Sequence, residues 1–233
     1  MWTLAALLAY FVKGLCGFAN TLVFTGVMNF AGIPAEITPV ELLLGYPANL
    51  VMIVQNRRAL KVRVWGPLAL LVIAGALPGA LLLKSVDARW IKLLFGMLLM
   101  GLALDMHFGG GTKRSPSWML LLVGVASGLL SGLFGVGALL AAYLGKTAGT
   151  GESFRANLCA VFLVENTFRL ALYLSLGLMK KETLFLALRL LPAMALGLAA
   201  GTALARHGGE PLGRRILPAV LFLSGAALIV YQL

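Results

Sequence analysis

The chain has 233 residues, of which 61% are hydrophobic and 12% are charged, and its mean hydropathy is +0.97. Soluble domains are about half apolar and about a quarter charged, so this composition excludes an ordinary soluble protein. A net charge of +11 would suggest nucleic-acid binding in a soluble chain, but most Lys and Arg residues here lie in short gaps between apolar runs and indicate membrane topology.

The apolar residues are gathered into long runs with little or no charge, and a helix needs about 20 residues to cross ~30 Å of hydrocarbon. We therefore predict an all-α integral membrane protein. Tryptophan, which prefers the membrane interface, stands at the start of three of the runs. The predicted membrane segments are 1–31, 39–54, 64–83, 90–106, 118–144, 156–176, 183–205 and 214–233.

The second four segments echo the first four, which predicts two repeated helical units, 1–108 and 118–233, joined by a Gly-rich linker at 109–117. Three landmarks recur in the same order, at offsets of 118, 117 and 122 residues. They are Gly14-Leu15-Cys16-Gly17 with Gly132-Leu133-Phe134-Gly135, Asn49 with Asn166, and Gly75-x-x-x-Gly79 with Gly197-x-x-x-Gly201. Paired glycines have a packing reason, because helices in lipid associate through close backbone approach.

Segments 1–31 and 118–144 are longer than one crossing requires and contain several glycines. We predict that each is a broken helix or a helical hairpin, since transporters place substrate where a helix is interrupted beside a water-filled cavity. The alternative is one long tilted helix in which the glycines serve packing alone.

Charge distribution tests the number of crossings. If segments 1–31 and 118–144 each cross the membrane once, eight of the Lys and Arg residues in the loops lie on each side. If both segments are hairpins, eleven lie on one side and five on the other. The positive-inside rule thus favours inverted repeats with both termini outside. The basic side would hold Arg57, Arg58, Lys61, Arg63, Lys113, Arg114, Lys146, Arg155, Arg206, Arg214 and Arg215.

Ionisable residues within membrane segments are rare and costly, so each is a functional candidate. Lys13 stands at the predicted break beside Gly14 and Gly17, where a cation and freed backbone N–H groups would meet an anion. Its alternative role is to extend to the membrane surface. Asn20 and Thr21, just past the break, are additional donors.

A second polar group lies in 156–176, where Glu165 and Arg169 have the i,i+4 spacing of a same-face ion pair. This pair is either an internal lock or part of proton or substrate coupling. The amides of Asn49, Asn157 and Asn166, together with Arg155, are further groups able to reach a central cavity. We leave Glu36 and Glu41 out of the predicted site. Thr38-Pro39 looks like a capped helix start, so we expect both glutamates to be solvated.

The chain resembles the sulfite exporter (TauE/SafE) family over nearly its whole length. The resemblance rests on Lys13-Gly14-Leu15-Cys16-Gly17-Phe18, Asn49 with the basic run after it, Ser131-Gly132-Leu133-Phe134-Gly135-Val136-Gly137, Phe154-Arg155-Ala156, and Leu191-Pro192-Ala193 with Gly197 and Gly201. It implies a secondary carrier for sulfite, thiosulfate, sulfonates or related anions. The chain departs from the family pattern at Ala19, where glycine is frequent, and at Ala138-Leu139, where glycine and proline are frequent.

These observations predict a multi-pass inner-membrane transporter that binds a small sulfur-containing anion near the midplane and works by alternating access. A passive anion channel and a membrane scaffold without transport are the alternatives. We expect no enzymatic activity, cofactor, metal site or nucleic-acid partner; the partners are the anion and the lipid bilayer, with a homodimer left open. The predicted substrate-binding residues are Lys13, Gly17, Asn20, Thr21, Asn49, Gly135, Gly137, Arg155 and Asn166, and Glu165 and Arg169 are the predicted coupling residues.

Overall fold

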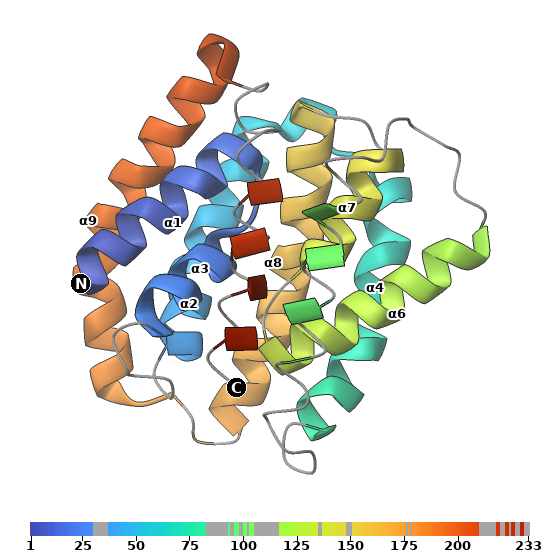
Figure 1. Cartoon of the computed structure of the whole chain (residues 1–233), viewed down its shortest axis with the longest axis horizontal. Coiled ribbons are helices and arrows are strands. Elements are labelled where there is room, and N and C mark those ends of the chain that lie inside the picture. The colour runs from blue at the N-terminus through green and yellow to red at the C-terminus, as the bar shows by residue number, and fades with distance from the viewer. Residues whose placement is uncertain are drawn as a thin grey trace.

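A computed structural model describes residues 1–29, 37–82, 117–134, 137–147, 151–175, 177 and 179–209, with short stretches of 93–104 and 218–230. The linker and most of segments 90–106 and 214–233 lie outside the described residues. The described part is helical throughout (Figure 1). Its helices are α1 (Trp2–Cys16), α2 (Asn20–Asn29), α3 (Ile37–Gln55), α4 (Val62–Leu82), α6 (Ser117–Phe134), α7 (Ala138–Thr147), α8 (Glu152–Ser175) and α9 (Lys181–Leu204), with the short turns η1 (Arg57–Ala59) and η2 (Ala205–Gly209).

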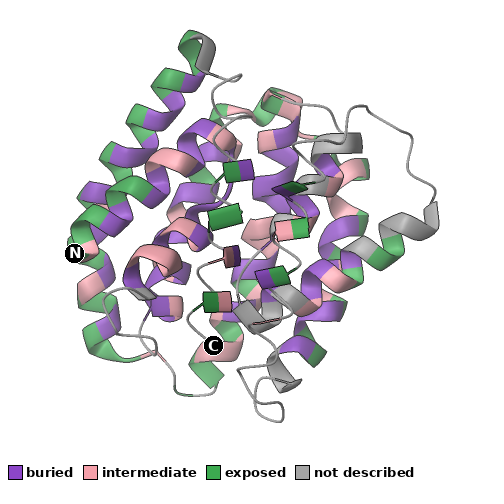
Figure 2. Ribbon diagram, viewed as in Figure 1, coloured by how far each residue is buried: buried purple, intermediate pink, exposed green. Residues whose placement is uncertain are grey.

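Four of these helical stretches are long and apolar enough to cross a membrane: Ile37–Gln55, Val62–Gly79, Glu152–Ser175 and Lys181–His207. Their outward faces carry exposed leucine and phenylalanine, as on α9, where Phe185 and Leu196 are exposed (Figure 2). An exposed apolar face of this kind is stable against lipid rather than water. The prediction of an all-α membrane protein is confirmed.

Both long first segments are interrupted, so the alternative of one continuous tilted helix is wrong. The first break follows Cys16 and contains Gly17 at φ 90° and Ala19 at φ 73°, both left-handed. After it, α2 folds back along α1, which brings Trp2 and Phe24 to a ring-centroid distance of 6.0 Å. The second break separates α6 from α7 after Phe134, 118 residues later.

The first helix of each half packs on a helix of the other half: α1 lies along α9, and α6 lies along α4. Glycine makes both contacts close. A Cβ on Gly14 would lie 2.6 Å from the Leu198 carbonyl oxygen, and one on Gly201 would collide with the Phe11 carbonyl oxygen. Gly75 and Gly128 have the same relation to α6 and α4. The predicted packing role of the paired glycines is confirmed, and the two halves are interlocked.

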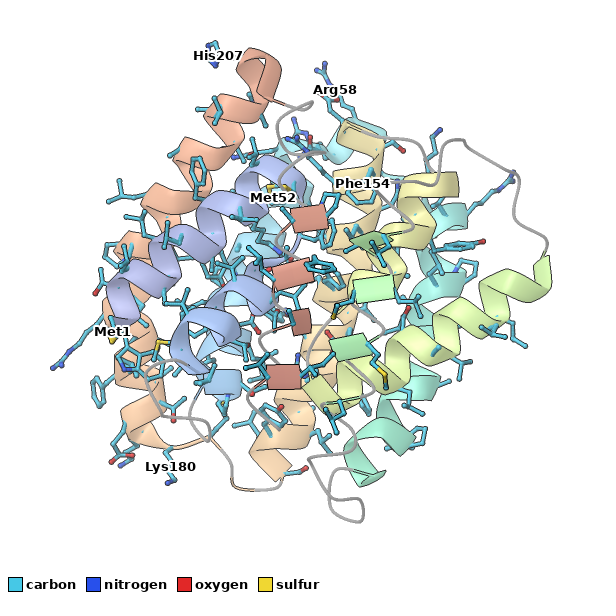
Figure 3. The ribbon with its side chains drawn as sticks, in the orientation of Figure 1. Met1, Met52, Arg58, Phe154, Lys180 and His207 are labelled. Atoms are coloured by element: carbon cyan, nitrogen blue, oxygen red, sulfur yellow. The ribbon has the colours of Figure 1, made fainter. Side chains whose placement is uncertain are left out.

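One end of the molecule gathers the connection between α3 and α4, the start of α8 and the end of α9. Asn157 of α8 accepts a hydrogen bond from the Lys61 backbone N–H (2.9 Å) and donates to the Ala59 carbonyl (3.3 Å). Figure 3 labels Arg58 and His207 at this end and Lys180 at the other. The described part of the predicted basic side therefore lies at one end.

Two hydrophobic cores flank the centre. One joins α1, α2, α3 and α9, and the other joins the first break to α4, α7 and α8. Between them pass the two helix breaks and the central parts of α3 and α8. This arrangement places the polar residues of four elements at the middle of an otherwise apolar structure.

Candidate functional site

A small polar pocket lies where the two helix breaks meet. Its volume is about 30 Å³, and one water needs about 10–15 Å³. In this conformation it holds a few atoms. The lining residues come from both breaks and from α1, α2, α3 and α8: Lys13, Phe18, Ala19, Asn20, Thr21, Leu22, Glu41, Asn49, Gly137, Phe162, Glu165 and Asn166.

Lys13 points into this pocket rather than to a membrane surface. Its side chain is 1% exposed, its Nζ donates to Asn20 Oδ1 at 3.0 Å, and it lies 5.8 Å from the centroid of the Phe162 ring. The alternative that Lys13 extends to the interface is wrong. A buried ammonium near the end of α1 and beside an aromatic face is a potential anion partner, because its charge is poorly screened there.

Glu41 corrects the sequence interpretation. It is 3% exposed, lines the pocket, and accepts hydrogen bonds through Oε1 from Asn20 Nδ2 (2.5 Å) and Thr21 Oγ1 (2.8 Å). We expected it to be solvated at a helix start. However, α3 already begins at Ile37, and α2 folds back over its first turns. Glu36 lies outside the described residues. A glutamate within the apolar run 39–54 was the signal that could have identified this site.

The ion pair predicted in 156–176 is present in α8. Arg169 Nε lies 3.5 Å from Glu165 Oε1, and the two side chains are 3% and 2% exposed. Arg169 also donates to the Tyr173 hydroxyl at 3.2 Å and lies 5.5 Å from the centroid of that ring. Glu165 and the neighbouring Asn166 line the pocket. The pocket is therefore surrounded by charges of both signs.

Asn49 is the other predicted amide in the lining. It is 2% exposed, and its Oδ1 has no hydrogen-bond partner among the described residues. A buried amide without a partner costs free energy, on the order of 1–3 kcal/mol. The amide end that faces the pocket is thus available to a bound water or ligand.

Gly17, Arg155 and Asn157 are absent from the described pocket lining, and Arg155 packs against the first break from outside the pocket. Arg155 donates to the Leu15 carbonyl oxygen at 3.0 Å, and a Cβ on Gly17 would lie 2.9 Å from the Arg155 Cγ. The Cys159 thiol lies 3.6 Å from the Gly17 carbonyl oxygen, and Asn157 binds the α3–α4 connection. Sequence spacing alone did not separate these residues from the pocket.

The second break contributes less polar chemistry. Gly137 lines the pocket, and a Cβ there would collide with the Phe162 ring. Gly135, the other predicted contact of this break, lies outside the described residues. Of the predicted residues, the structure brings together Lys13, Asn20, Thr21, Asn49, Gly137, Glu165 and Asn166, with Arg169 directly behind Glu165.

Comparison with known proteins gives two matches. The profile described as "Sulfite exporter TauE/SafE" matches residues 2–228. The protein named "Probable inner membrane transporter protein TsaS" from Comamonas testosteroni is 27% identical over 191 residues, which cover 80% of this chain and 80% of that protein. No solved structure matches the chain.

Proposed function

The chain belongs to the sulfite exporter TauE/SafE family and is a multi-pass inner-membrane transporter, and we propose that it carries a small sulfur-containing anion such as sulfite, thiosulfate or a sulfonate by alternating access. The single observation that supports this proposal best is the position of Lys13. A buried ammonium faces a pocket at the junction of two helix breaks, beside amide and hydroxyl donors.

Oxyanion chemistry fits this set of groups. A sulfonate or sulfite presents several oxygens that accept hydrogen bonds but have no strong donors of their own when ionised. Lys13, Thr21 and the amide of Asn166 supply donors from three helices. Charge-assisted hydrogen bonds from a buried cation are the strongest of these contacts. Geometry of this kind favours a small anion over a cation.

Alternating access is supported by the way the first helix of each half packs on a helix of the other half. Residues 7 and 11 of α1 face residues 197 and 201 of α9, and residues 71 and 75 of α4 face residues 124 and 128 of α6, so the helices in each pair are parallel. We infer that corresponding segments of the two halves run in opposite directions, as inverted repeats do. Rocking one interlocked pair against the other would open the central pocket to one side at a time.

The test is transport by the purified protein in proteoliposomes. We expect saturable uptake of radiolabelled thiosulfate, with competition by sulfite and methanesulfonate and no competition by an organic cation of similar size. Absence of saturable uptake for every anion of this panel, in protein that elutes as a single species, would overturn the proposal. Conductance in a planar bilayer far above carrier turnover would instead identify an anion channel.

A further inference from the structure

The pocket is surrounded by two cations and two carboxylates among the described residues, all nearly inaccessible to water. Lys13 and Arg169 are the cations, and Glu41 and Glu165 are the carboxylates. With all four ionised, these charges cancel. An entering anion would leave the site with an uncompensated negative charge, and a poorly solvated environment penalises such a charge strongly. Binding of the anion therefore favours neutralisation of one carboxylate.

The two carboxylates differ in how their charge is compensated. Glu165 has a direct ion-pair partner, since Arg169 Nε lies at 3.5 Å. Glu41 is held instead by neutral donors, the Asn20 amide and the Thr21 hydroxyl. In this network Asn20 links Glu41 to Lys13, accepting from Lys13 and donating to Glu41. Arg169, which is paired with Glu165, also attracts the Glu41 carboxylate. Glu41 is thus the carboxylate whose charge is more easily removed.

Glu41 is hydrogen-bonded to α1 and α2 and lies within the electrostatic influence of α8. Tyr10 of α1 donates to its backbone carbonyl at 3.4 Å, and Asn20 and Thr21 of α2 bind its carboxylate. Gly45, one turn later on α3, lies beside these groups: a Cβ there would be in van der Waals contact, 3.4 Å from Asn166 Nδ2 and 3.5 Å from Glu41 Oε1. Glu165 and Arg169 of α8 complete the charged surroundings.

We propose that the anion is bound together with a proton, and that the Glu41 carboxylate takes up this proton from solvent. This inference rests on the anion-transport function proposed above and names its coupling ion. Protonation of Glu41 removes the charge that attracts Lys13 through Asn20, so the ammonium becomes available to the anion. The net charge of the site is the same before and after the proton and the anion bind together.

The experiment is calorimetric binding of methanesulfonate and ethanesulfonate, monoanions that stay ionised from pH 5.5 to about 8.5, in buffers of different ionisation enthalpy. The wild-type protein should take up about one proton per anion at the upper end of this range, and its affinity should fall about tenfold per pH unit there. Glu41→Gln mimics the protonated side chain. This variant should bind the anion with little pH dependence and without proton uptake.

Glu182→Gln, at an exposed carboxylate of α9 outside the pocket lining, is the matched control, and it should retain proton uptake and the pH dependence. Wild-type binding without proton uptake, or loss of binding in folded Glu41→Gln protein, would overturn the inference while leaving anion transport intact. Failure of the wild-type protein to bind either anion at any pH would instead overturn the proposed function, and the proton-coupling inference with it.

Discussion

The two helix breaks share a backbone plan and differ in chemistry. α1 and α6 end, and α2 and α7 begin, at positions related by the same offset of 118 residues. At the first break this offset relates Lys13 and Asn20 to Ser131 and Ala138 of the second. The glycines that build the fold are thus repeated, whereas the groups that would hold a ligand are concentrated at one break.

A similar division separates α3 from α8. The offset of 117 that relates Asn49 to Asn166 places Ala48 opposite Glu165 and Met52 opposite Arg169. The ion pair of α8 has therefore no equivalent in α3, whose acid, Glu41, lies earlier in its helix. The two halves therefore share a fold, but the polar groups of the site are not repeated in it. Substitutions at related positions should have unequal effects on the site and equal effects on helix packing.

The largest effect is expected from Arg169→Met, which introduces the residue found at the related position of α3. Removal of one partner leaves Glu165 buried without its cation, which typically costs about 3–5 kcal/mol. We expect a decrease of this size in the free energy of unfolding, measured by denaturant titration in detergent micelles. Met52→Leu, the control in α3, should cost less than about 1.5 kcal/mol.

A double variant makes this prediction sharper. Arg169→Met combined with Glu165→Gln should recover most of the lost stability, because no unpaired charge then remains. If the double variant is as unstable as Arg169→Met alone, the loss comes from the packing of Arg169 against Tyr173 and not from the ion pair.

Lys13→Met should reduce thiosulfate uptake into proteoliposomes by roughly 30-fold or more, since removal of a buried charged donor costs about 2–5 kcal/mol of binding free energy. Its related residue, Ser131, provides the comparison: Ser131→Ala removes a hydrogen bond to the Glu165 carboxylate but no formal charge, so uptake should fall less, by about three- to tenfold. Equal losses in the two variants would contradict the one-sided site. Elution of both proteins as single species in detergent is required for the comparison.

The packing glycines provide the opposite case, in which the two halves should behave alike. Gly75→Ala and Gly197→Ala, at related positions, each place a Cβ against a carbonyl oxygen of the neighbouring helix. Each should lower the free energy of unfolding by about 1–3 kcal/mol. Gly26→Ala is the control: no described atom lies within 4 Å of a Cβ there, so it should be neutral or stabilising by up to about 1 kcal/mol. Thermal unfolding in detergent gives the comparison.

Sequence reasoning identified the four spans among the described residues, both breaks and the glycine contacts. Each depends on a local property: apolar length, chain reversal at glycine, or the absence of a side chain. The ion pair of Glu165 and Arg169 was predictable for the same reason, from helical spacing. Burial of Glu41 was not, because it depends on α2 folding back over α3, a tertiary relation that Thr38-Pro39 did not indicate. The position of Arg155 outside the described pocket lining was not predictable either, because sequence spacing does not fix where a long side chain points.

The smallest effect concerns Ala19, where the chain departs from the glycine frequent in its family. Ala19 has φ 73°, a left-handed conformation that costs a residue with a Cβ about 1–2 kcal/mol. Ala19→Gly removes this strain but gives the unfolded chain more freedom, a loss of about 0.4–1 kcal/mol, so the net stabilisation should be about 0.5–1 kcal/mol.

Gly17→Ala is the opposite change in the same break. It forces a Cβ into φ 90° and against Arg155, so it should destabilise by about 1–2 kcal/mol or more. Thermal unfolding in detergent should therefore move in opposite directions for Ala19→Gly and Gly17→Ala. A lower melting temperature for Ala19→Gly would mean that the Ala19 methyl group contributes more through packing against Phe18 and Leu22 than its backbone strain costs. The break would then be held by its side chains and not by the conformational freedom of its glycine.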